Sequence, residues 1–283
     1  MNQNTKKKKS ILSKIGVMQG RLSPMINKKI QCFPWRYWKN EFNICNKLNI
    51  KKLEWTVDHE KFEDNPICTK VGRQQIILLQ NKYKIQVNSV TADFFMQKPF
   101  YNKKNNKEKN FNRLINFIID ASKVNIKYII LPLVDNASIR NKSEERVLIK
   151  LLNNLKPILK SCNITLLFES DYAPKKLLKF IKKFDKDFFG INYDSGNSAE
   201  MTYNFNDEKI YFNYVQNIHI KDKDSNGLSV DLGKGRANIK ELLKYLIKSN
   251  YEGNLILQTA RNKHNVAIIK KNIYFLFKIL QNL

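Results

Sequence analysis

The chain has 283 residues, of which 42% are hydrophobic, and a formal net charge of +26. A chain of this length buries a full core, and the sequence has no Pro-, Gly- or Ser-rich linker, which favours a single domain. No apolar run approaches the roughly 20 residues of a membrane-spanning helix, which excludes that class. The four cysteines lack metal-ligand spacing, which is typical of buried thiols in a reducing cytoplasm.

The first fourteen residues, MNQNTKKKKSILSK, are expected to form a disordered basic tail before a domain over residues 15–283. Lys14 interrupts the apolar stretch too early for a signal peptide, and no small-residue cleavage site follows. Eight short apolar runs come next, and each has the length of a buried strand. They cover residues 15–19, 51–55, 85–90, 127–132, 164–169, 189–194, 215–220 and 254–258.

Between these runs, apolar residues recur at three- and four-residue steps, which is the period of an amphipathic helix. The predicted helices cover residues 38–48, 69–83, 108–124, 144–160, 175–184, 238–248 and 266–282, and a loosely periodic one covers 198–213. The strands begin about 25 to 42 residues apart, the size of one βα unit. Eight such units predict an α/β fold, a single-domain (βα)8 TIM barrel.

Polar side chains stand at or just after the end of every predicted strand. They are Gln19, Glu54, Asp93, Asp135, Glu169, Asp194, His219 and Gln258. A buried strand has no physical reason to end in a carboxylate or an imidazole, whereas a barrel gathers all its strand ends at the catalytic face. The last four side chains offer two carboxylates, an imidazole and an amide oxygen, which suit a divalent ion such as Mn, Mg, Co or Zn.

Each ligand candidate also has a structural interpretation. His219 alone would fit a hydrogen-bonded residue of the core, and Asp194 alone would fit the cap of the following helix. Four such side chains at four consecutive strand ends favour a metal site over four separate structural roles.

The excess of basic residues raises nucleic-acid binding as a hypothesis. Only 8 of the 51 basic residues are Arg, the side chain best suited to phosphate and base contacts. The lysines are spread over nearly every predicted helix, as the codon bias of an AT-rich genome would produce. We therefore expect no specific nucleic-acid partner.

Seven segments resemble the sugar phosphate isomerase/epimerase group of the xylose-isomerase-like TIM barrels. They are GVMQGRLSP, KLEWT, NSVTADFF, LLFESD, YDSGN, NIHIKD and LQTAR, and the resemblance spans residues 15–265. In that superfamily the metal ligands are Glu, Asp, His and Glu at the ends of strands five to eight. The resemblance assigns them to Glu169, Asp194, His219 and Gln258. LQTAR is similar to the version in a subgroup that often accompanies surface-sugar biosynthesis.

Gln258 departs from the superfamily pattern, and the departure has a chemical consequence. Its amide oxygen can bind a metal but cannot take a proton at neutral pH, which argues against epimerisation by two carboxylates. The resemblance then implies a single base, Glu169, which removes the proton beside a carbonyl while the metal stabilises the enediolate. Return of the proton to the neighbouring carbon gives isomerisation. Glu54 is an alternative base, and an ion pair with a neighbouring Lys or Arg explains it equally well.

Basic residues near the strand ends predict an acidic or phosphorylated sugar. They are Arg21, Lys221, Lys234, Arg236 and Arg261. Loops after strands seven and eight often bind phosphate in such barrels. Gly233 and Gly235 would let backbone amides approach an anion, although a plain turn explains the same motif. Aromatic side chains could stack on the sugar or belong to the core, namely Trp35, Trp38, Trp55, Phe94 and Phe95.

Two other functions stay open. An apurinic-site endonuclease of the same superfamily would explain the positive charge. Those enzymes hold three zinc ions with many histidines, however, and this chain has only three histidines. A barrel that has lost catalysis and only binds a sugar or a partner protein would explain Gln258, but not the retained Glu169, Asp194 and His219. We expect a small sugar or sugar phosphate as partner and no membrane, and the sequence leaves homo-oligomerisation undecided.

Overall fold

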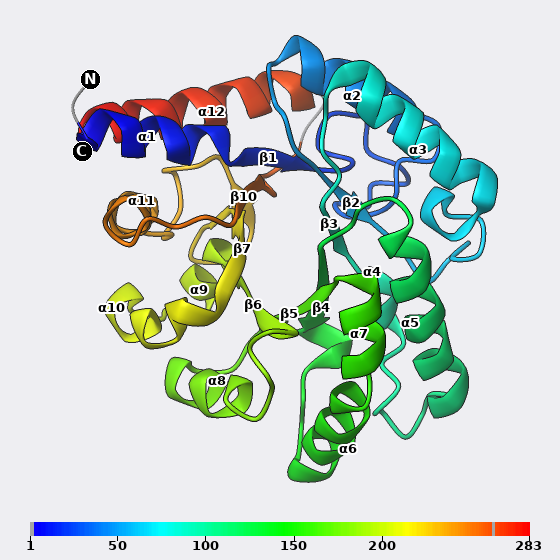
Figure 1. Ribbon diagram of the computed structural model, residues 1–283. Coiled ribbons are helices and arrows are strands. Elements are labelled where there is room, and N and C mark those ends of the chain that lie inside the picture. Colours follow the sequence, from blue (N-terminus) through cyan, green and yellow to red (C-terminus); the bar gives the residue numbers. More distant parts are fainter. Residues whose placement is uncertain (1–2, 262–263) are drawn as a thin grey trace. The chain divides into compact units, whose positions relative to one another are not determined.

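The computed structural model describes residues 3–261 and 264–283. Eight parallel strands form a closed barrel in the order β1-β10-β7-β6-β5-β4-β3-β2 (Figure 1), so the predicted (βα)8 fold is confirmed. By its internal contacts the chain divides into two compact units, Met1–Leu53 with Tyr193–Leu283 and Glu54–Asn192. The domain boundary expected at residue 15 stays a prediction.

The first unit contains the strands of both chain ends. Its elements are α1 (Gln3–Ser13), β1 (Ile15–Met18), α2 (Trp38–Lys47), α9 (Ser195–Glu200), α10 (Phe205–Glu208), η3 (Lys209–Tyr214), β7 (Val215–Ile220), β8 (Asp222–Lys223), β9 (Ser229–Val230), α11 (Ile239–Lys248), β10 (Asn254–Leu257) and α12 (Asn265–Gln281). β10 lies between β1 and β7, with Leu257 opposite Val17 and Ile256 opposite His219. β8 and β9 form a separate antiparallel pair.

The structure corrects the expected disordered tail, because residues Gln3–Ser13 form α1. This helix runs beside α12 in Figure 1. Ile11 is 2% exposed, and Lys14 Nζ donates to Ser10 Oγ at 2.6 Å and pairs with Glu252 at 3.3 Å. The buried Ile11 and the paired Lys14 explain the ordered helix. The run of four lysines before Ser10 made the segment look uniformly polar, so the sequence did not indicate a helix with a buried side.

The second unit continues the alternation of strands and helices. Its elements are β2 (Leu53–Thr56), η1 (Pro66–Cys68), α3 (Lys70–Tyr83), β3 (Ser89–Thr91), α4 (Asp93–Gln97), α5 (Lys107–Ser122), β4 (Tyr128–Leu133), η2 (Asp135–Ala137), α6 (Lys142–Asn153), α7 (Lys156–Cys162), β5 (Thr165–Ser170), α8 (Pro174–Ile181) and β6 (Phe189–Asp194). β2 begins and β6 ends just across the boundary with the first unit.

Two predicted helices are broken into shorter pieces. The helix expected over 144–160 is α6 followed by α7, because Pro157 at the start of α7 has no N–H to continue the hydrogen bonding of α6. The weakly periodic stretch 198–213 contains α9, α10 and η3, and the Asn204 side chain caps α10 by accepting the N–H of Asn206. Both breaks lie between strands and leave the order of the barrel unchanged.

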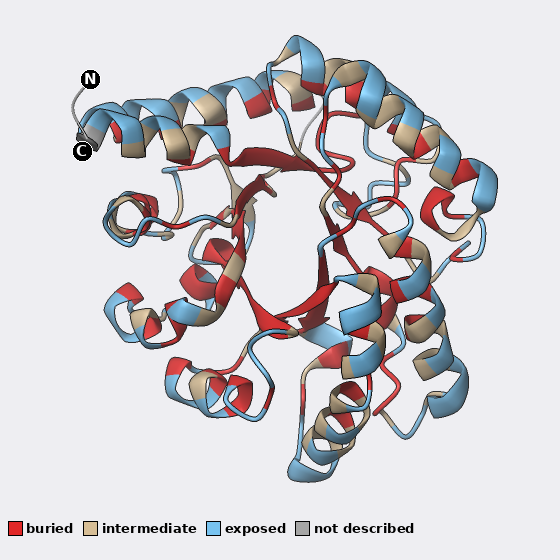
Figure 2. Cartoon of the chain, viewed as in Figure 1, coloured by how far each residue is buried: buried red, intermediate tan, exposed pale blue. Residues whose placement is uncertain are grey.

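The strands are made mostly of buried residues, drawn in red in Figure 2, while the helices also carry many exposed residues. In the second unit, Tyr128 lies opposite Thr165 and Ile130 opposite Leu167. Tyr128, Ile130 and Leu167 form one hydrophobic cluster. Because alternate residues of a strand share a face, Glu169 lies on the same face as Leu167.

Within residues 3–261 and 264–283, no helix combines the length and the apolar character that a membrane span requires.

Candidate active site

Glu169 stands near the carboxyl end of β5 and is 7% exposed. Leu167 lies opposite Gly190 of β6, so the residues two positions further along, Glu169 and Asn192, share a face. Asn192 Nδ2 donates to Glu169 Oε2 at 2.8 Å. Asn192 was not among the predicted site residues, although its place two residues before Asp194 indicated that both side chains point to one face.

Asp194 is the last residue of β6 and the cap of α9. Its Oδ1 accepts the backbone N–H of Gly196 at 2.7 Å and of Asn197 at 2.9 Å. The capping interpretation is therefore confirmed, but for one oxygen only. Oδ2 is buried and has no hydrogen-bond partner in the described part of the chain. It lies 3.8 Å from His219 Nδ1, beyond hydrogen-bond distance.

Lys221 controls the charge state of Asp194. Burial alone would raise the pKa of Asp194, but the Lys221 charge, assisted by His219 and by the Asn197 N–H, lowers that pKa to about 2. The Lys221 stem is packed so closely that a Cβ at residue 196 would lie 2.7 Å from its Cγ. Gly196 is thus required for this packing. Asp194 is a carboxylate at neutral pH.

Glu169, Asp194 and His219 each offer one ligand atom, and these atoms lie within 4.8 Å of one another. β6 carries contacts to both partners, since Asn192 bonds Glu169 and Asp194 faces His219. His219 is fully buried on β7. Two carboxylates and one imidazole are a donor set that divalent cations accept.

Gln258 follows β10, and its backbone N–H donates to Ile220 O at 3.0 Å. Because Ile256 lies opposite His219, Gln258 and His219 share a face. The Gln258 Oε1 atom is buried and lacks a hydrogen-bond partner among the described residues. An unpaired buried oxygen costs about 1–3 kcal/mol, so this oxygen and Asp194 Oδ2 both fit the requirements of a cation. The residues therefore suit the metal that the sequence predicted.

Glu54, the alternative base, is fully buried on β2. Ser89 Oγ donates to its Oε2 at 2.8 Å and Thr91 Oγ1 to its Oε1 at 3.0 Å. Hydroxyl groups of β3 thus bind both carboxylate oxygens, and the ion pair with a neighbouring Lys or Arg stays a prediction. This environment favours a structural role.

Two of the predicted substrate-binding arginines hold loops together. Arg21 is 3% exposed, and it donates from Nε to Thr259 O and from Nη1 to Ile30 O, both at 3.0 Å. Arg261 donates to Ile30 O and Ser23 O, also at 3.0 Å. Both guanidinium groups therefore tie the loop after β1 to the segment after β10.

The glycine-rich loop after β7 binds an internal carboxylate. The N–H groups of Gly233 and Gly235 donate to Asp222 Oδ2 at 2.9 and 3.0 Å, and that of Ala237 donates to Oδ1 at 2.8 Å. These amides were expected to approach a substrate anion, and the structure corrects that expectation. Lys234 and Arg236 in this loop are exposed, and their contact with a substrate stays a prediction.

The aromatic candidates belong mainly to the core. Trp55 is fully buried and its Nε1 donates to Asn65 Oδ1 at 3.0 Å. Phe94 packs edge-on against Phe62, with ring centroids 4.7 Å apart. These rings have no surface left for a sugar.

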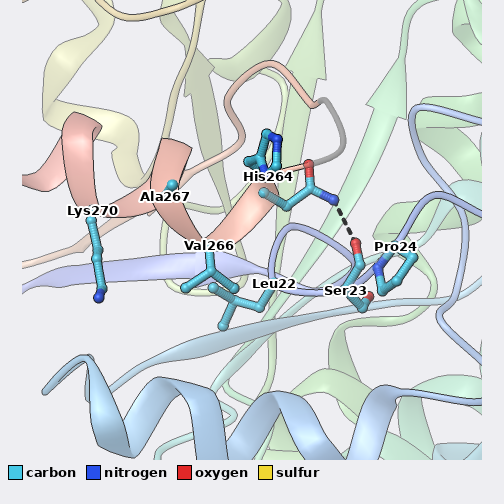
Figure 3. A pocket seen from close by; sticks show the side chains of 8 residues that line it. Leu22, Ser23, Pro24, His264, Val266, Ala267 and Lys270 are labelled. Atoms are coloured by element: carbon cyan, nitrogen blue, oxygen red, sulfur yellow. Dashed lines mark hydrogen bonds between the residues drawn. The ribbon is translucent and has the colours of Figure 1, made fainter.

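A cavity of about 430 Å³ lies between the loop after β1 and the start of α12 (Figure 3). Asn265 Nδ2 donates to Ser23 O at 2.6 Å across its wall. Its lining residues are Leu22, Ser23, Pro24, His264, Asn265, Val266, Ala267 and Lys270. The lining contains none of the four predicted metal ligands, so this cavity does not include the cluster of Glu169, Asp194 and His219.

Solved structures share this fold over nearly their whole length. The xylose isomerase domain protein of Planctomyces limnophilus matches with a TM-score of 0.73 and 17% identity, covering 95% of this chain and 98% of that one. The IOLI protein with a zinc atom has a TM-score of 0.73 and 14% identity, with 95% and 98% covered. D-Psicose 3-epimerase with D-tagatose from Clostridium cellulolyticum H10 has a TM-score of 0.71 and 12% identity, with 94% and 99% covered.

At these identities the structural matches show a common fold. A search of the curated proteins finds no significant match. Residues 79–279, more than half of the chain, match the family described as Xylose isomerase-like TIM barrel, in agreement with the closed parallel barrel. The chain belongs to the Xylose isomerase-like TIM barrel family.

Proposed function

We propose that this protein is a metal-dependent isomerase or epimerase that moves a proton beside the carbonyl of a sugar or sugar phosphate. The observation that carries the proposal is the cluster of Glu169, Asp194 and His219, whose ligand atoms lie within 4.8 Å of one another. The epimerase that was solved with D-tagatose has the same fold and supports a sugar as the substrate class.

Glu169, Asp194 and His219 would hold the ion, with Gln258 as the fourth ligand. A bound divalent ion supplies Lewis-acid stabilisation of the negative charge that develops on the substrate oxygens. Oxygen and nitrogen donors together accept Mn, Mg, Co or Zn, and the zinc-bound relative supports this class of ion.

Glu169 is the proposed base that takes the proton from carbon. It is 7% exposed and oriented by Asn192, as a positioned general base requires. Gln258 cannot take a proton, so the second carboxylate of a symmetric epimerisation is missing. A single base that returns the proton to the neighbouring carbon explains why Glu169 is a carboxylate and why Gln258 need not be one. This scheme favours isomerisation.

Lys221 supports an anionic sugar as the substrate, because it carries a positive charge directly after β7 and is only partly buried. Arg21 and Arg261 contribute less to this argument, since backbone carbonyls already bind their guanidinium groups. The resemblance of LQTAR to the surface-sugar subgroup leads us to propose that biosynthetic setting.

The test is a screen of sugar phosphates and nucleotide sugars in deuterated water with Mn or Mg. Incorporation of deuterium at the substrate carbon, followed by NMR, reports proton abstraction even when the equilibrium hides turnover. We expect exchange with wild type, and a rate about 10²- to 10⁴-fold lower for Glu169→Gln, which keeps an oxygen but cannot act as a base. Exchange that survives in Glu169→Gln, or metal binding without exchange on any substrate, would contradict the proposal.

The histidines argue against an endonuclease with three zinc ions. Arg113 Nη1 approaches His59 Nδ1 at 2.8 Å, and His264 precedes α12, so only His219 belongs to the described cluster. Cleavage of an abasic DNA duplex, together with three zinc ions per chain, would favour the nuclease instead.

A further inference from the structure

Asn192 is a buried amide, 2% exposed, that contacts the proposed base. Its Nδ2 donates to Glu169 Oε2 at 2.8 Å. We propose that Asn192 is a positioning residue: by binding Oε2 it determines which oxygen of Glu169 serves as the metal ligand, and it orders the site before the ion arrives. This inference rests on the proposed function, which makes Glu169 a ligand.

The pleat of β6 explains how one strand can do this. Asn192 and Asp194 point to one face, whereas Tyr193 between them points to the other, where its hydroxyl donates to Glu208 Oε2 at 3.0 Å. Gly190, the preceding residue on the first face, has no side chain and lies opposite Leu167. β6 therefore supplies one ligand, Asp194, and the donor that orients another, Glu169.

Asp194 has a similar arrangement, which supports the inference. Its Oδ1 accepts two backbone N–H groups, while Oδ2 faces His219 without a hydrogen bond among the described residues. Protein N–H donors bind Oδ1 of Asp194, and the Asn192 amide likewise binds Oε2 of Glu169. Such outer contacts keep a ligand in its binding orientation and adjust its affinity for the ion.

An amide suits this role for electrostatic reasons. The Nδ2 group of Asn192 donates to a carboxylate and carries no net charge, so it orients Glu169 without repelling the cation. A lysine or arginine would donate equally well but would place a positive charge beside the ion. A side chain that only filled space would need no polar atom on this buried face.

The experiment measures Mn²⁺ affinity by titration calorimetry on the full chain without substrate. Asn192→Leu removes the donor and keeps the branching and number of heavy atoms, and we expect its affinity to fall about 10- to 100-fold, the range for outer-shell contacts. Asn192→Ala is the second variant in case leucine disturbs folding, which circular dichroism and thermal melting report. Unchanged Mn²⁺ affinity in a folded variant would overturn the inference.

Asn272→Leu is the matched control. It removes another buried asparagine, 1% exposed, which lies on α12 and accepts the N–H of Leu232 at 3.4 Å. We expect its Mn²⁺ affinity to equal that of wild type. An equal loss of Mn²⁺ affinity in Asn272→Leu and Asn192→Leu would show that any disturbance of the core weakens binding. That result would overturn the inference.

A double-mutant cycle separates orientation of Glu169 from other effects. In a Glu169→Ala background, loss of the Asn192 amide should change Mn²⁺ affinity by far less than in wild type, because the side chain that it orients is gone. A full effect in that background would show that Asn192 acts elsewhere. If wild type binds no divalent ion, the proposed function fails as well, whereas a metal-binding wild type with an indifferent Asn192→Leu removes this inference alone.

Discussion

Two kinds of buried carboxylate in this protein look alike in the sequence and differ in how their oxygens are satisfied. Glu41 accepts the N–H groups of Gly20 and Leu22 and the hydroxyl of Ser23, and Asp222 accepts three backbone N–H groups. Among the described residues, Asp194 has protein donors on one oxygen only. The first kind organises loops around itself, and the second keeps an oxygen for a ligand. The donor count, rather than burial, distinguishes the two.

The largest effect should come from removing the nitrogen donor of the cluster. His219→Ala leaves Glu169 and Asp194 in place but deletes the imidazole, and we expect Mn²⁺ affinity to fall by more than about 100-fold, beyond the usual outer-shell range. Calorimetric titration measures this directly. Asp222→Asn is the matched comparison, because it changes a carboxylate that organises a loop. Its Mn²⁺ affinity should equal that of wild type. If His219→Ala binds the ion as well as wild type does, the ligand assignment is wrong.

Glu41, one of the carboxylates that organise loops, should make the free energy of unfolding depend on pH. Burial raises its pKa to about 7, against the lowering effects of the Gly20 and Leu22 N–H groups, the Ser23 hydroxyl and the Arg261 charge. The pKa of an unfolded Glu is near 4.5, so between these values the folded chain binds more protons than the unfolded chain. Its contribution to stability is therefore largest below about pH 4.5 and falls by up to about 3 kcal/mol as the pH rises to 7.

Urea unfolding at several pH values measures this slope. Glu41→Gln, which cannot titrate, should flatten the decline between pH 5 and 7 relative to wild type. An unaltered slope in Glu41→Gln would assign the pH dependence to other groups and remove Glu41 from it.

Asp222→Asn tests a loop-building carboxylate with little change of size. An asparagine turns an N–H donor towards some of the three backbone N–H groups that the carboxylate accepts, which leaves buried groups unpaired. We expect a loss of about 2 kcal/mol in the free energy of unfolding. Denaturant titration gives the value, and a loss near zero would show that water replaces the carboxylate in this loop.

The smallest effect should come from converting the neutral ligand into a charged one. Gln258→Glu adds a carboxylate next to β7, and we expect Mn²⁺ affinity to rise about tenfold, roughly 1.4 kcal/mol. The added group could also exchange a proton with the substrate, so product stereochemistry is the second measurement. Unchanged metal affinity would exclude residue 258 as a ligand, and its carry-over from the family would fail.

Much of the fold follows from local periodicity. β6 and β7 match their predicted ranges of 189–194 and 215–220, because each is a short apolar run between helices. The proximity of Asp194 and His219 follows from topology, since strand ends of a barrel meet at one face. The resemblance to a known family then gave the site its chemistry.

Other contacts depend on register or on distant loops, which local patterns do not contain. The hydrogen bond from Asn192 to Glu169 can be predicted only if the register of β5 against β6 is known exactly, residue by residue. The N–H groups of Gly233 and Gly235 bind Asp222, which lies 11 and 13 residues earlier in the chain, so the sequence alone wrongly indicated that these glycines bind a substrate anion. α1 was missed because its burial depends on one isoleucine within a basic stretch.

The pairing of β1 with β10 has a consequence for how the protein folds. Arg21, just after β1, donates to Thr259 O across 238 residues of sequence, and Ile15 lies opposite Leu255. Contacts between such distant residues require a large loop to close, so they form late and slow the folding of the whole domain. During synthesis, β1 can pair with β10 only after the last strand has been made. The Arg21–Thr259 contact would therefore belong to the final step of folding, and its loss should speed unfolding more than it slows refolding.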